Sequence, residues 1–351
     1  MTVIIGIDPH KHSHTAVALD VDDRVLGSLR VDADRTQVDR LLAFAAPWPE
    51  RVWAVENANG LGRLLSRQLV AAGQPVVDVP AKLAAQVRAL SGAGHKTDDH
   101  DARSTAVAAR HARALRPVEV DDLTVLLGLL VERRWQIVSQ RQKTLCRIHD
   151  QLVALTPGGA PKQLSATKTA VALRRLRPVD EVGGYRKQIA KELLAELRIL
   201  DRKRKEIDRQ LDQALKRHGT TLTQIPGIGR VGAATLVSVV GDVTRFATAA
   251  RFASFAGTAP IAASSGDKVR YRLNHGGHRQ VNKILHTAAK VQRRLPGDGR
   301  DYIERRLAEG KSRAEATRAL KRHLSNVLYR RMLADQRAAA RLVSGEDKQV
   351  A

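Results

Sequence analysis

The sequence predicts a protein of three parts, in which an α/β domain is followed by two long helices and then by a mostly α-helical domain. Three observations support this prediction. Short β-rich runs alternate with helical spacing over the first 115 residues, leucines and isoleucines recur every three or four positions in the middle, and a basic, glycine-punctuated stretch follows. We place the boundaries at 1–115, 116–217 and 218–340, with a tail at 341–351.

The predicted strands of the first part are apolar runs rich in valine and isoleucine. They cover residues 3–7, 15–19, 24–31, 52–55 and 76–79. Helical spacing marks residues 60–72, 81–91 and 98–114. A hairpin followed by strands that alternate with helices predicts a mixed sheet, and this order fits the ribonuclease-H-like arrangement.

The middle and C-terminal parts carry the positive charge. The chain has 60 Lys+Arg and 36 Asp+Glu, a net charge of +24, whereas residues 1–110 contain 13 of each. A basic surplus of this size predicts a polyanionic partner, most often nucleic acid. With only four Phe, four Tyr and three Trp, the chain should bind phosphates through Arg and Lys rather than bases by stacking.

Several classes of protein are disfavoured. A single cysteine, Cys146, forms no internal disulfide and no cysteine-based zinc site, which favours a reducing compartment. The longest apolar runs, 123–131 and 231–240, fall short of the ~18 residues of a membrane span. Because the start has no basic segment before its first strand, we expect no signal peptide, and a cytoplasmic, nucleoid-associated protein.

Four acidic residues occupy positions suited to a metal site. Asp8 lies at the end of the first strand and Glu56 at the end of the fourth. Asp98 and Asp101 are three residues apart on a predicted helix and therefore share a face, whereas Asp99 should point elsewhere. Mg²⁺ prefers oxygen ligands. Four converging carboxylates would hold two such ions roughly 4 Å apart and clamp a phosphodiester between them.

Each acid also has a simpler structural explanation. Asp8 suits a turn before Pro9, Asp98 suits a helix N-cap, and Asp101 suits a solvated first turn. Glu56 is harder to explain in this way because it follows a buried strand directly, and together the four favour a site. Three nearby histidines are explained by a β-hairpin with alternating polar residues, and we expect no metal site at them: His10, His12 and His14.

The middle part is predicted to be two long helices. Apolar residues at three- and four-residue spacing run from 123 to 155 and again from 189 to 215, separated by a turn at 156–161. The helices form either an antiparallel hairpin or a coiled coil with a second protomer, and they space or dimerise the protein. The charged run 202–205 is explained by a solvated face.

A glycine turn opens the C-terminal part. Residues 225–229, followed by a helix of small residues at 232–240, resemble a helix-hairpin-helix, in which the turn containing Gly227 and Gly229 presents N–H groups to a phosphate. An ordinary tight connection is the alternative explanation. The basic surroundings favour nucleic acid.

Three segments with acidic residues, 6–11, 55–60 and 96–102, resemble the corresponding blocks of the DEDD transposases of bacterial insertion sequences (insertion-sequence family one-ten). That family has a RuvC-like N-terminal domain, and its four acids would fall on Asp8, Glu56, Asp98 and Asp101. Pro9-His10 is a mild departure from the family pattern. The segments 252–260, 264–266, 271–283, 310–311 and 314–333 resemble the family's C-terminal domain, so the match runs from about residue 3 to 335, interrupted by the helical middle.

The resemblance implies further properties. A serine of the family's Ser-Gly pair attacks DNA and forms a covalent phosphoserine link; this role would fall on Ser265, with Ser264 as the alternative. Without the resemblance, this motif would be interpreted as a plain loop. The family also implies a guide RNA encoded by the element, and dimers that pair into tetramers.

The candidate nucleic-acid contacts are basic or glycine residues in these motifs, with solvated surface charge as the alternative for the basic ones. They are Lys11, Lys96, Gly227, Gly229, Arg270, Arg272, Arg279 and Lys283.

We therefore expect a Mg²⁺-dependent DNA transposase or recombinase that excises and inserts its own mobile element through a serine–DNA intermediate. One alternative is a metal-only junction nuclease of the RuvC type, in which Ser265 is structural. A second is a non-catalytic nucleic-acid-binding protein, in which the acids are caps and turns.

Overall fold

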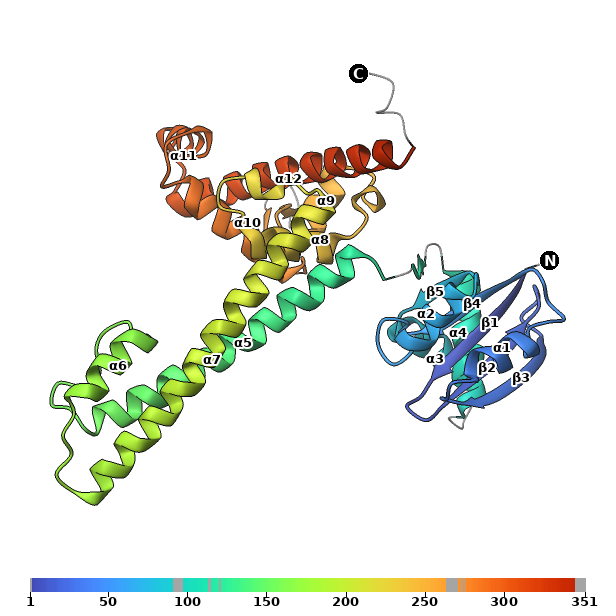
Figure 1. Cartoon of the computed structure of the whole chain (residues 1–351). Coiled ribbons are helices and arrows are strands. Elements are labelled where there is room, and N and C mark those ends of the chain that lie inside the picture. Colours follow the sequence, from blue (N-terminus) through green and yellow to red (C-terminus); the bar gives the residue numbers. More distant parts are fainter. Residues whose placement is uncertain are drawn as a thin grey trace. The chain divides into compact units, whose positions relative to one another are not determined.

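The computed structural model describes residues 2–90, 97–112, 115–119, 121–262, 271–272, 274 and 276–344. The chain divides into two compact units, Met1–Asp121 and Asp122–Ala351 (Figure 1). No helix in these described ranges is long and apolar enough to cross a membrane.

The first unit is built on a mixed sheet with the strand order β3-β2-β1-β4-β5-β6. Its strands are β1 (Val3–Pro9), β2 (Ser13–Leu19), β3 (Val25–Asp32), β4 (Arg51–Glu56), β5 (Val76–Val79) and β6 (Arg116–Pro117). The first three form antiparallel hairpins, β4 lies parallel to β1, and β5 lies parallel to β4. The predicted ribonuclease-H-like arrangement is confirmed.

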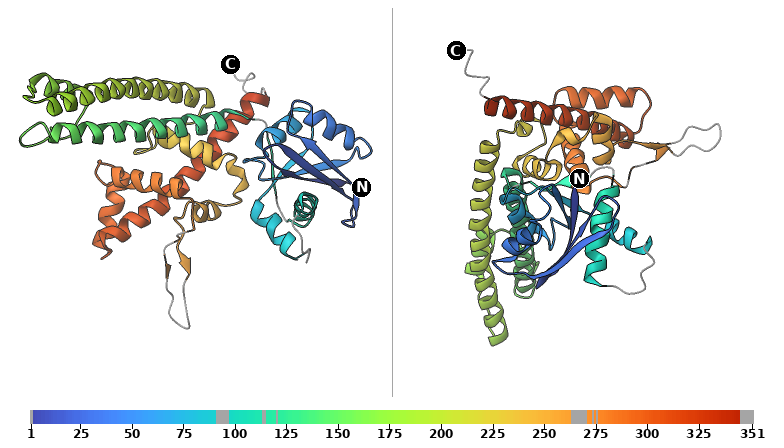
Figure 2. Two further views of the ribbon diagram at one scale, coloured as in Figure 1. Left: turned by 90° about the horizontal axis from the view of Figure 1, so that it is seen from below. Right: turned by 90° about the vertical axis from the view of Figure 1, so that its right-hand side faces the viewer.

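Helices cover both faces of this sheet. They are α1 (Gln37–Phe44), α2 (Arg63–Ala71), α3 (Ala81–Leu90) and α4 (Asp98–His111). Since side chains alternate along a strand, Ile5 and Ile7 of β1 pack with Leu41 of α1 on one face, and Gly6 faces α4 on the other. Figure 2 shows α1 and α4 on opposite sides of the sheet.

The second unit begins with two long helices, α5 (Leu123–Val153) and α7 (Glu181–His218), which pair within the chain as an antiparallel hairpin (Figure 1). Two ion pairs fix their register. Arg134 lies 2.6 Å from Asp208, and Arg141 lies 2.6 Å from Asp201. Seven residues forward on one helix match seven residues backward on the other, as antiparallel packing requires.

Shorter helices complete the second unit. They are α6 (Ala166–Arg175), which packs on α7, and then α8 (Arg230–Val240), α9 (Ala249–Phe255), α10 (Arg279–Gln292), α11 (Asp298–Ala308) and α12 (Arg313–Ser344). Two short strands, β7 (Ile261–Ala262) and β8 (Tyr271–Arg272), pair antiparallel. The core of this region includes the fully buried Phe252 of α9 and Leu328 of α12. The mostly α-helical prediction is confirmed.

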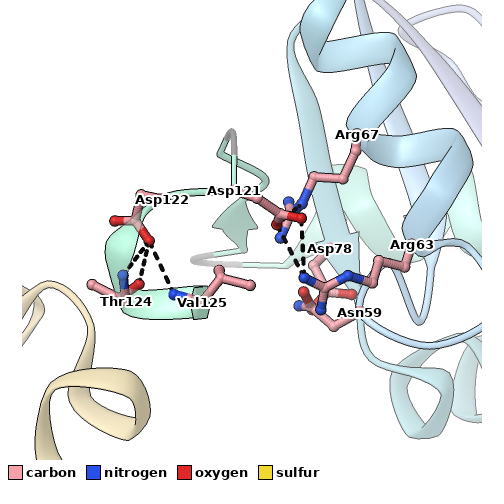
Figure 3. Close-up of polar contacts among 8 residues, drawn as sticks. All are labelled: Asn59, Arg63, Arg67, Asp78, Asp121, Asp122, Thr124 and Val125. Atoms are coloured by element: carbon pink, nitrogen blue, oxygen red, sulfur yellow. Dashed lines mark hydrogen bonds and ion pairs between the residues drawn. The ribbon is translucent and has the colours of Figure 1, made fainter. Parts of the chain in front are cut away.

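Two consecutive acids mark the junction between the units (Figure 3). Asp121 accepts hydrogen bonds from Arg63 at 3.0 Å and Arg67 at 2.7 Å, which attaches it to α2. Asp122 accepts hydrogen bonds from the backbone of Thr124 and Val125, which caps α5. The first unit thus ends, and the second begins, at residues with separate hydrogen-bonding roles.

Candidate acidic metal centre

The site is positioned by the close approach of α4 to β1. A Cβ atom at Gly6 would lie 2.1 Å from the Ala102 carbonyl oxygen and 2.6 Å from the Ala106 nitrogen. Glycine on the strand and alanine on the helix therefore bring the two backbones together. Asp8 lies two residues after Gly6 on the same side of the strand, and Asp101 directly precedes Ala102.

Asp8 lies near the end of β1 and pairs with Thr15 of β2. Its side chain is buried, and the parallel pairing of Ile7 with Val55 places it beside the end of β4, where Glu56 lies. Neighbouring parallel strands thus bring two carboxylates to one edge of the sheet, as in the sequence prediction.

His10 joins this group, although the sequence interpretation placed no metal site at the histidines. Asp8, His10 and Asp98 each offer one ligand atom, and these three atoms lie within 4.8 Å of one another. His10 Nδ1 is 3.5 Å from Asp8 Oδ2. By contrast, His14 is buried, and its Nε2 lies 3.0 Å from Oε1 of Gln37 in α1, on the opposite face of the sheet from Asp8.

Asp98 and Asp101 lie in the first turn of α4. The helix is capped by Thr97, whose hydroxyl accepts a hydrogen bond from the His100 N–H at 3.3 Å. Asp98 is therefore not the N-cap, which removes its simplest structural explanation. It lies 3.3 Å from Arg30 of β3, whereas Asp101 is buried.

Glu56 experiences the negative charge of this cluster. Burial raises the pKa of its carboxyl, and the nearby Asp8 and Asp101 raise it further. The Thr105 hydroxyl opposes this shift from 3.4 Å away, and it also lies 3.0 Å from the Asp101 carbonyl oxygen. All four predicted acids are thus linked through Asp8 and Glu56.

Arg88 of α3 is a member of the site that sequence reasoning missed. Its guanidinium forms an ion pair with the buried Asp101. The charges of Asp101, Glu56 and Asp8 all act to raise the pKa of Arg88, with the hydrogen bond to Asp101 as the largest cause. The only sequence signal was its position on a helix that follows a strand end, where an arginine is normally a surface residue.

Asp78 is a second residue that the sequence analysis left out. From β5 it accepts hydrogen bonds from the Ala58 backbone at 2.8 Å and the Asn59 side chain at 3.0 Å (Figure 3 draws the second contact). It thereby fixes the loop that follows Glu56. An acid within the run Val-Val-Asp-Val was the available signal.

The remaining predicted residues are distributed over both units. Lys11 is exposed in the turn after β1, Arg279 is exposed at the start of α10, and Lys283 lies 5.2 Å from the centre of the Trp135 ring. Arg272 belongs to β8. Four predicted residues lie outside the described part of the chain: Lys96, Ser264, Ser265 and Arg270.

The two glycines of the predicted phosphate turn differ in their surroundings. Gly227 has a φ of +88°, and a Cβ atom there would lie 2.7 Å from the Ala288 Cα of α10. Gly229 is the N-cap of α8 and has open space around its Cα. Gly227 is thus needed for packing, whereas no contact requires a glycine at position 229.

Comparison with known proteins agrees with this architecture. Residues 5–157 match the IS110 DEDD transposase family, and residues 219–304 match the transposase family described as IS116/IS110/IS902. An uncharacterized 44.8 kDa protein of insertion element IS116 from Streptomyces clavuligerus is 29% identical, over 95% of each chain. An uncharacterized 42 kDa protein of IS900 from Mycobacterium paratuberculosis is also 29% identical, over 92% of this chain and 94% of its own.

Among solved structures, Thermus thermophilus RuvC bound to a Holliday junction substrate aligns with 34% of this chain and 100% of its own, at 22% identity and a TM-score of 0.28. The two family matches together cover most of the chain and fall on both of its units. The chain belongs to the IS110 family of insertion-element transposases.

Proposed function

We propose that the protein excises and inserts its own mobile element, and that the acidic centre of the first unit cleaves the DNA strands. The observation that carries this proposal is the grouping of Asp8, His10 and Asp98, close to a Glu56 carboxyl whose pKa is raised by burial and by the charges of Asp8 and Asp101. Membership of a transposase family supports DNA as the substrate.

The donor atoms of this centre fit a divalent ion. Carboxylate oxygens dominate, as Mg²⁺ prefers, and one imidazole nitrogen from His10 is also acceptable to Mn²⁺. Asp8, His10 and Asp98 would hold one ion, and Glu56 and Asp101 would complete a second site that shares Asp8. When bound, such ions neutralise the phosphate and stabilise charge on the attacking and leaving oxygens.

The protein's own groups then have defined tasks. Asp8 and Glu56, fixed on paired strands, keep the ligand oxygens in place without loop motion. The Thr105 hydroxyl donates a hydrogen bond to the Glu56 carboxylate and orients it, and Asp78 fixes the loop that follows Glu56. Arg88 balances the negative charge of the cluster.

Ser265 is proposed as the nucleophile. Its Oγ forms a bond to the scissile phosphorus while the bond from phosphorus to one sugar oxygen breaks, and that oxygen takes up a proton as the hydroxyl Oγ loses one. The reverse attack by a sugar hydroxyl on the phosphoserine rejoins the strands and releases the serine. The family resemblance supports this role, a guide RNA encoded by the element, and assembly of dimers into tetramers.

An excision assay in cells tests the catalytic proposal. The gene is kept in its native flanking DNA, and the circular junction of the element is amplified from wild type, Asp101→Asn, Ser265→Ala and Asp99→Asn. Asp99 is the matched control because it lies in the same helical turn and is exposed. We expect circles from wild type and Asp99→Asn only.

Other results identify other functions. Circles from Ser265→Ala and from a double variant that also lacks Ser264 would favour a metal-only nuclease. Circles from Asp101→Asn would contradict the acidic centre, and salt-sensitive binding with no circles from any variant would favour a binding protein. Sequencing of RNA that co-purifies with the chain tests the guide RNA, and its absence would overturn that part.

A further inference from the structure

A basic pocket lies in the second unit between α10 and α12. The sequence analysis selected none of its basic residues for phosphate binding, although it selected Arg279 and Lys283 on the same helix α10. It is open and has a volume of about 680 Å³. Five cations line it. They are Lys290 of α10, Arg293 at the C-cap of that helix, and Arg313, Arg318 and Lys321 of α12. None of the described residues that line it is a carboxylate.

The cations form one stripe on each helix. On α10, Asn282, His286, Lys290 and Arg293 follow at intervals of four, four and three residues, which places them on a single face. On α12, the lining residues between 313 and 321 also recur on one face. Because α10 and α12 pack against each other, the two stripes border the same pocket.

The protein balances these charges only weakly. The hydrogen bonds from Ser312 are the largest causes that lower the pKa of Glu315, and the charge of Arg318 is a smaller one. Within the described part of the chain, none of the five cations forms an ion pair with a carboxylate, although Arg134, Arg141 and other arginines of the same unit do. The nearby Glu315 hydrogen-bonds with Ser312 at the start of α12 instead. Like charges that face one another without partners destabilise a fold, so an arrangement of this kind indicates a bound anion.

Lys321 is held in place rather than solvated. Its ammonium is half-buried and donates a hydrogen bond to Asn282 Oδ1 at 2.8 Å. Asn282 in turn donates to the carbonyl oxygens of Ala256 and Gly257, at 3.0 and 2.9 Å. Burial and the nearby Arg318 lower the pKa of Lys321, and burial and then Lys321 lower that of His286. A fixed, partly desolvated ammonium differs from a mobile surface lysine.

We propose that this pocket binds the phosphate backbone of duplex DNA and anchors it on the C-terminal unit. The stripe from Arg313 to Lys321 spans about 12 Å along α12, which is long enough to face two or three successive phosphates of one strand, at about 3.4 Å of axis each. A row of this length suits a polymer better than a single small anion. The choice of DNA rests on the proposed function.

The test measures DNA binding without cleavage. Full-length protein in EDTA is titrated into a fluorescent duplex that carries one end of the element, over a series of salt concentrations. The pocket variant is Lys290→Gln/Arg318→Gln, with one exposed residue from each helix, and the control is Arg202→Gln/Lys203→Gln on α7, which removes the same charge from exposed positions.

We expect the pocket variant to bind about tenfold more weakly at moderate salt, and the slope of log K against log[salt] to fall by about two, one for each lost phosphate contact. The control should change the slope by less than half as much. Thermal melting checks that each variant folds, and Lys290→Gln/Arg313→Gln replaces the first pair if it does not.

Two results would overturn the proposal. One is an equal change in the pocket and control variants, and the other is a larger loss on a structured RNA of the same charge than on the duplex. Because the assay contains no divalent ion, an inactive acidic centre would leave the pocket result unchanged, so the two proposals fail separately.

Discussion

The guanidinium of Arg88 forms an ion pair with the buried carboxylate of Asp101, joining α3 to the first turn of α4. The Asp101 side chain is buried, at 7% exposure, and that of Arg88 is partly exposed, at 31%. The same arginine experiences the charges of Glu56 and Asp8. A single cation from the protein therefore balances several acids of the centre, which explains how the cluster is tolerated in the fold.

The first prediction concerns this arginine. Arg88→Met keeps much of the side-chain volume and removes the charge, which leaves Asp101 buried and unbalanced. In EDTA we expect the free energy of unfolding to fall by about 2 kcal/mol, and Mg²⁺ should raise the melting temperature more than it does in wild type. Thermal melts with and without Mg²⁺ measure both effects.

Arg103→Met is the control, because Arg103 is an exposed residue of α4. It should change neither the stability nor the response to Mg²⁺. If Arg88→Met and Arg103→Met melt alike in EDTA, Arg88 does not balance the acidic centre.

The second prediction concerns the contact between β1 and α4. Gly6→Ala would place a Cβ atom 2.1 Å from the Ala102 carbonyl oxygen, so the helix must move away from the strand. We expect a loss of about 3 kcal/mol in unfolding free energy and, where the protein still folds, loss of DNA cleavage. Denaturant unfolding measures the first effect.

Gly184→Ala in α7 is the opposite case, because no atom lies within 4 Å of the new Cβ. It should stabilise the protein by about 0.5–1 kcal/mol, since alanine favours helices over glycine. A Gly6→Ala protein as stable as wild type would contradict the packing argument.

The sequence predicts most of what places the acids, and less of what balances them. The five longer strands, α4 and the four carboxylates follow from apolar runs, from spacing and from residues at strand ends, because each of these signals is local. Arg88, Asp78 and His10 act through partners far away in sequence or across a turn, and their own surroundings resemble ordinary surface positions. The short helix α1 was not predicted, because its eight residues make little more than two turns, too few for a helical period to be recognised.

The basic pocket could not be predicted for the same reason. Each of its cations lies on an amphipathic helix where a basic residue is expected on the outer face, and only the packing of α10 on α12 makes the two stripes face the same space. The helix-hairpin-helix glycines illustrate the reverse case. The sequence analysis assigned Gly227 and Gly229 the same role, whereas the structure gives them different surroundings.

The third prediction concerns pH. Asp23 in the turn between β2 and β3 accepts hydrogen bonds from Arg110 at 2.8 Å and His111 at 2.9 Å, which joins that turn to the end of α4. Burial acts to raise the pKa of Asp23, but the hydrogen bonds from His111 and Arg110 outweigh it and lower the pKa.

A carboxyl whose pKa is lower in the folded state stabilises the fold above its unfolded pKa, and this contribution is lost as the pH falls through the folded pKa. Asp23→Asn should therefore cost roughly 0.5–1 kcal/mol near pH 6, and the difference from wild type should shrink below about pH 4. Urea unfolding across this range measures it. A difference that grows on acidification would contradict the assigned shift.

The last prediction separates packing from phosphate binding at the turn before α8. Gly227 has a φ of +88° and adjoins Ala288, and the Gln292 side chain donates a hydrogen bond to the Pro226 carbonyl at 2.9 Å, so the turn is attached to α10. Gly227→Ala should lower the unfolding free energy by roughly 3 kcal/mol, from backbone strain and overpacking together.

Gly229→Ala meets no atom within 4 Å and should cost about 0.5 kcal/mol, because alanine is a poorer N-cap than glycine. If the N–H groups at the start of α8 contact a phosphate, the new methyl group obstructs it, and Gly229→Ala should weaken DNA binding while the protein stays folded. Normal binding by Gly229→Ala would leave the turn a purely structural connection, and normal stability of Gly227→Ala would contradict its packing role.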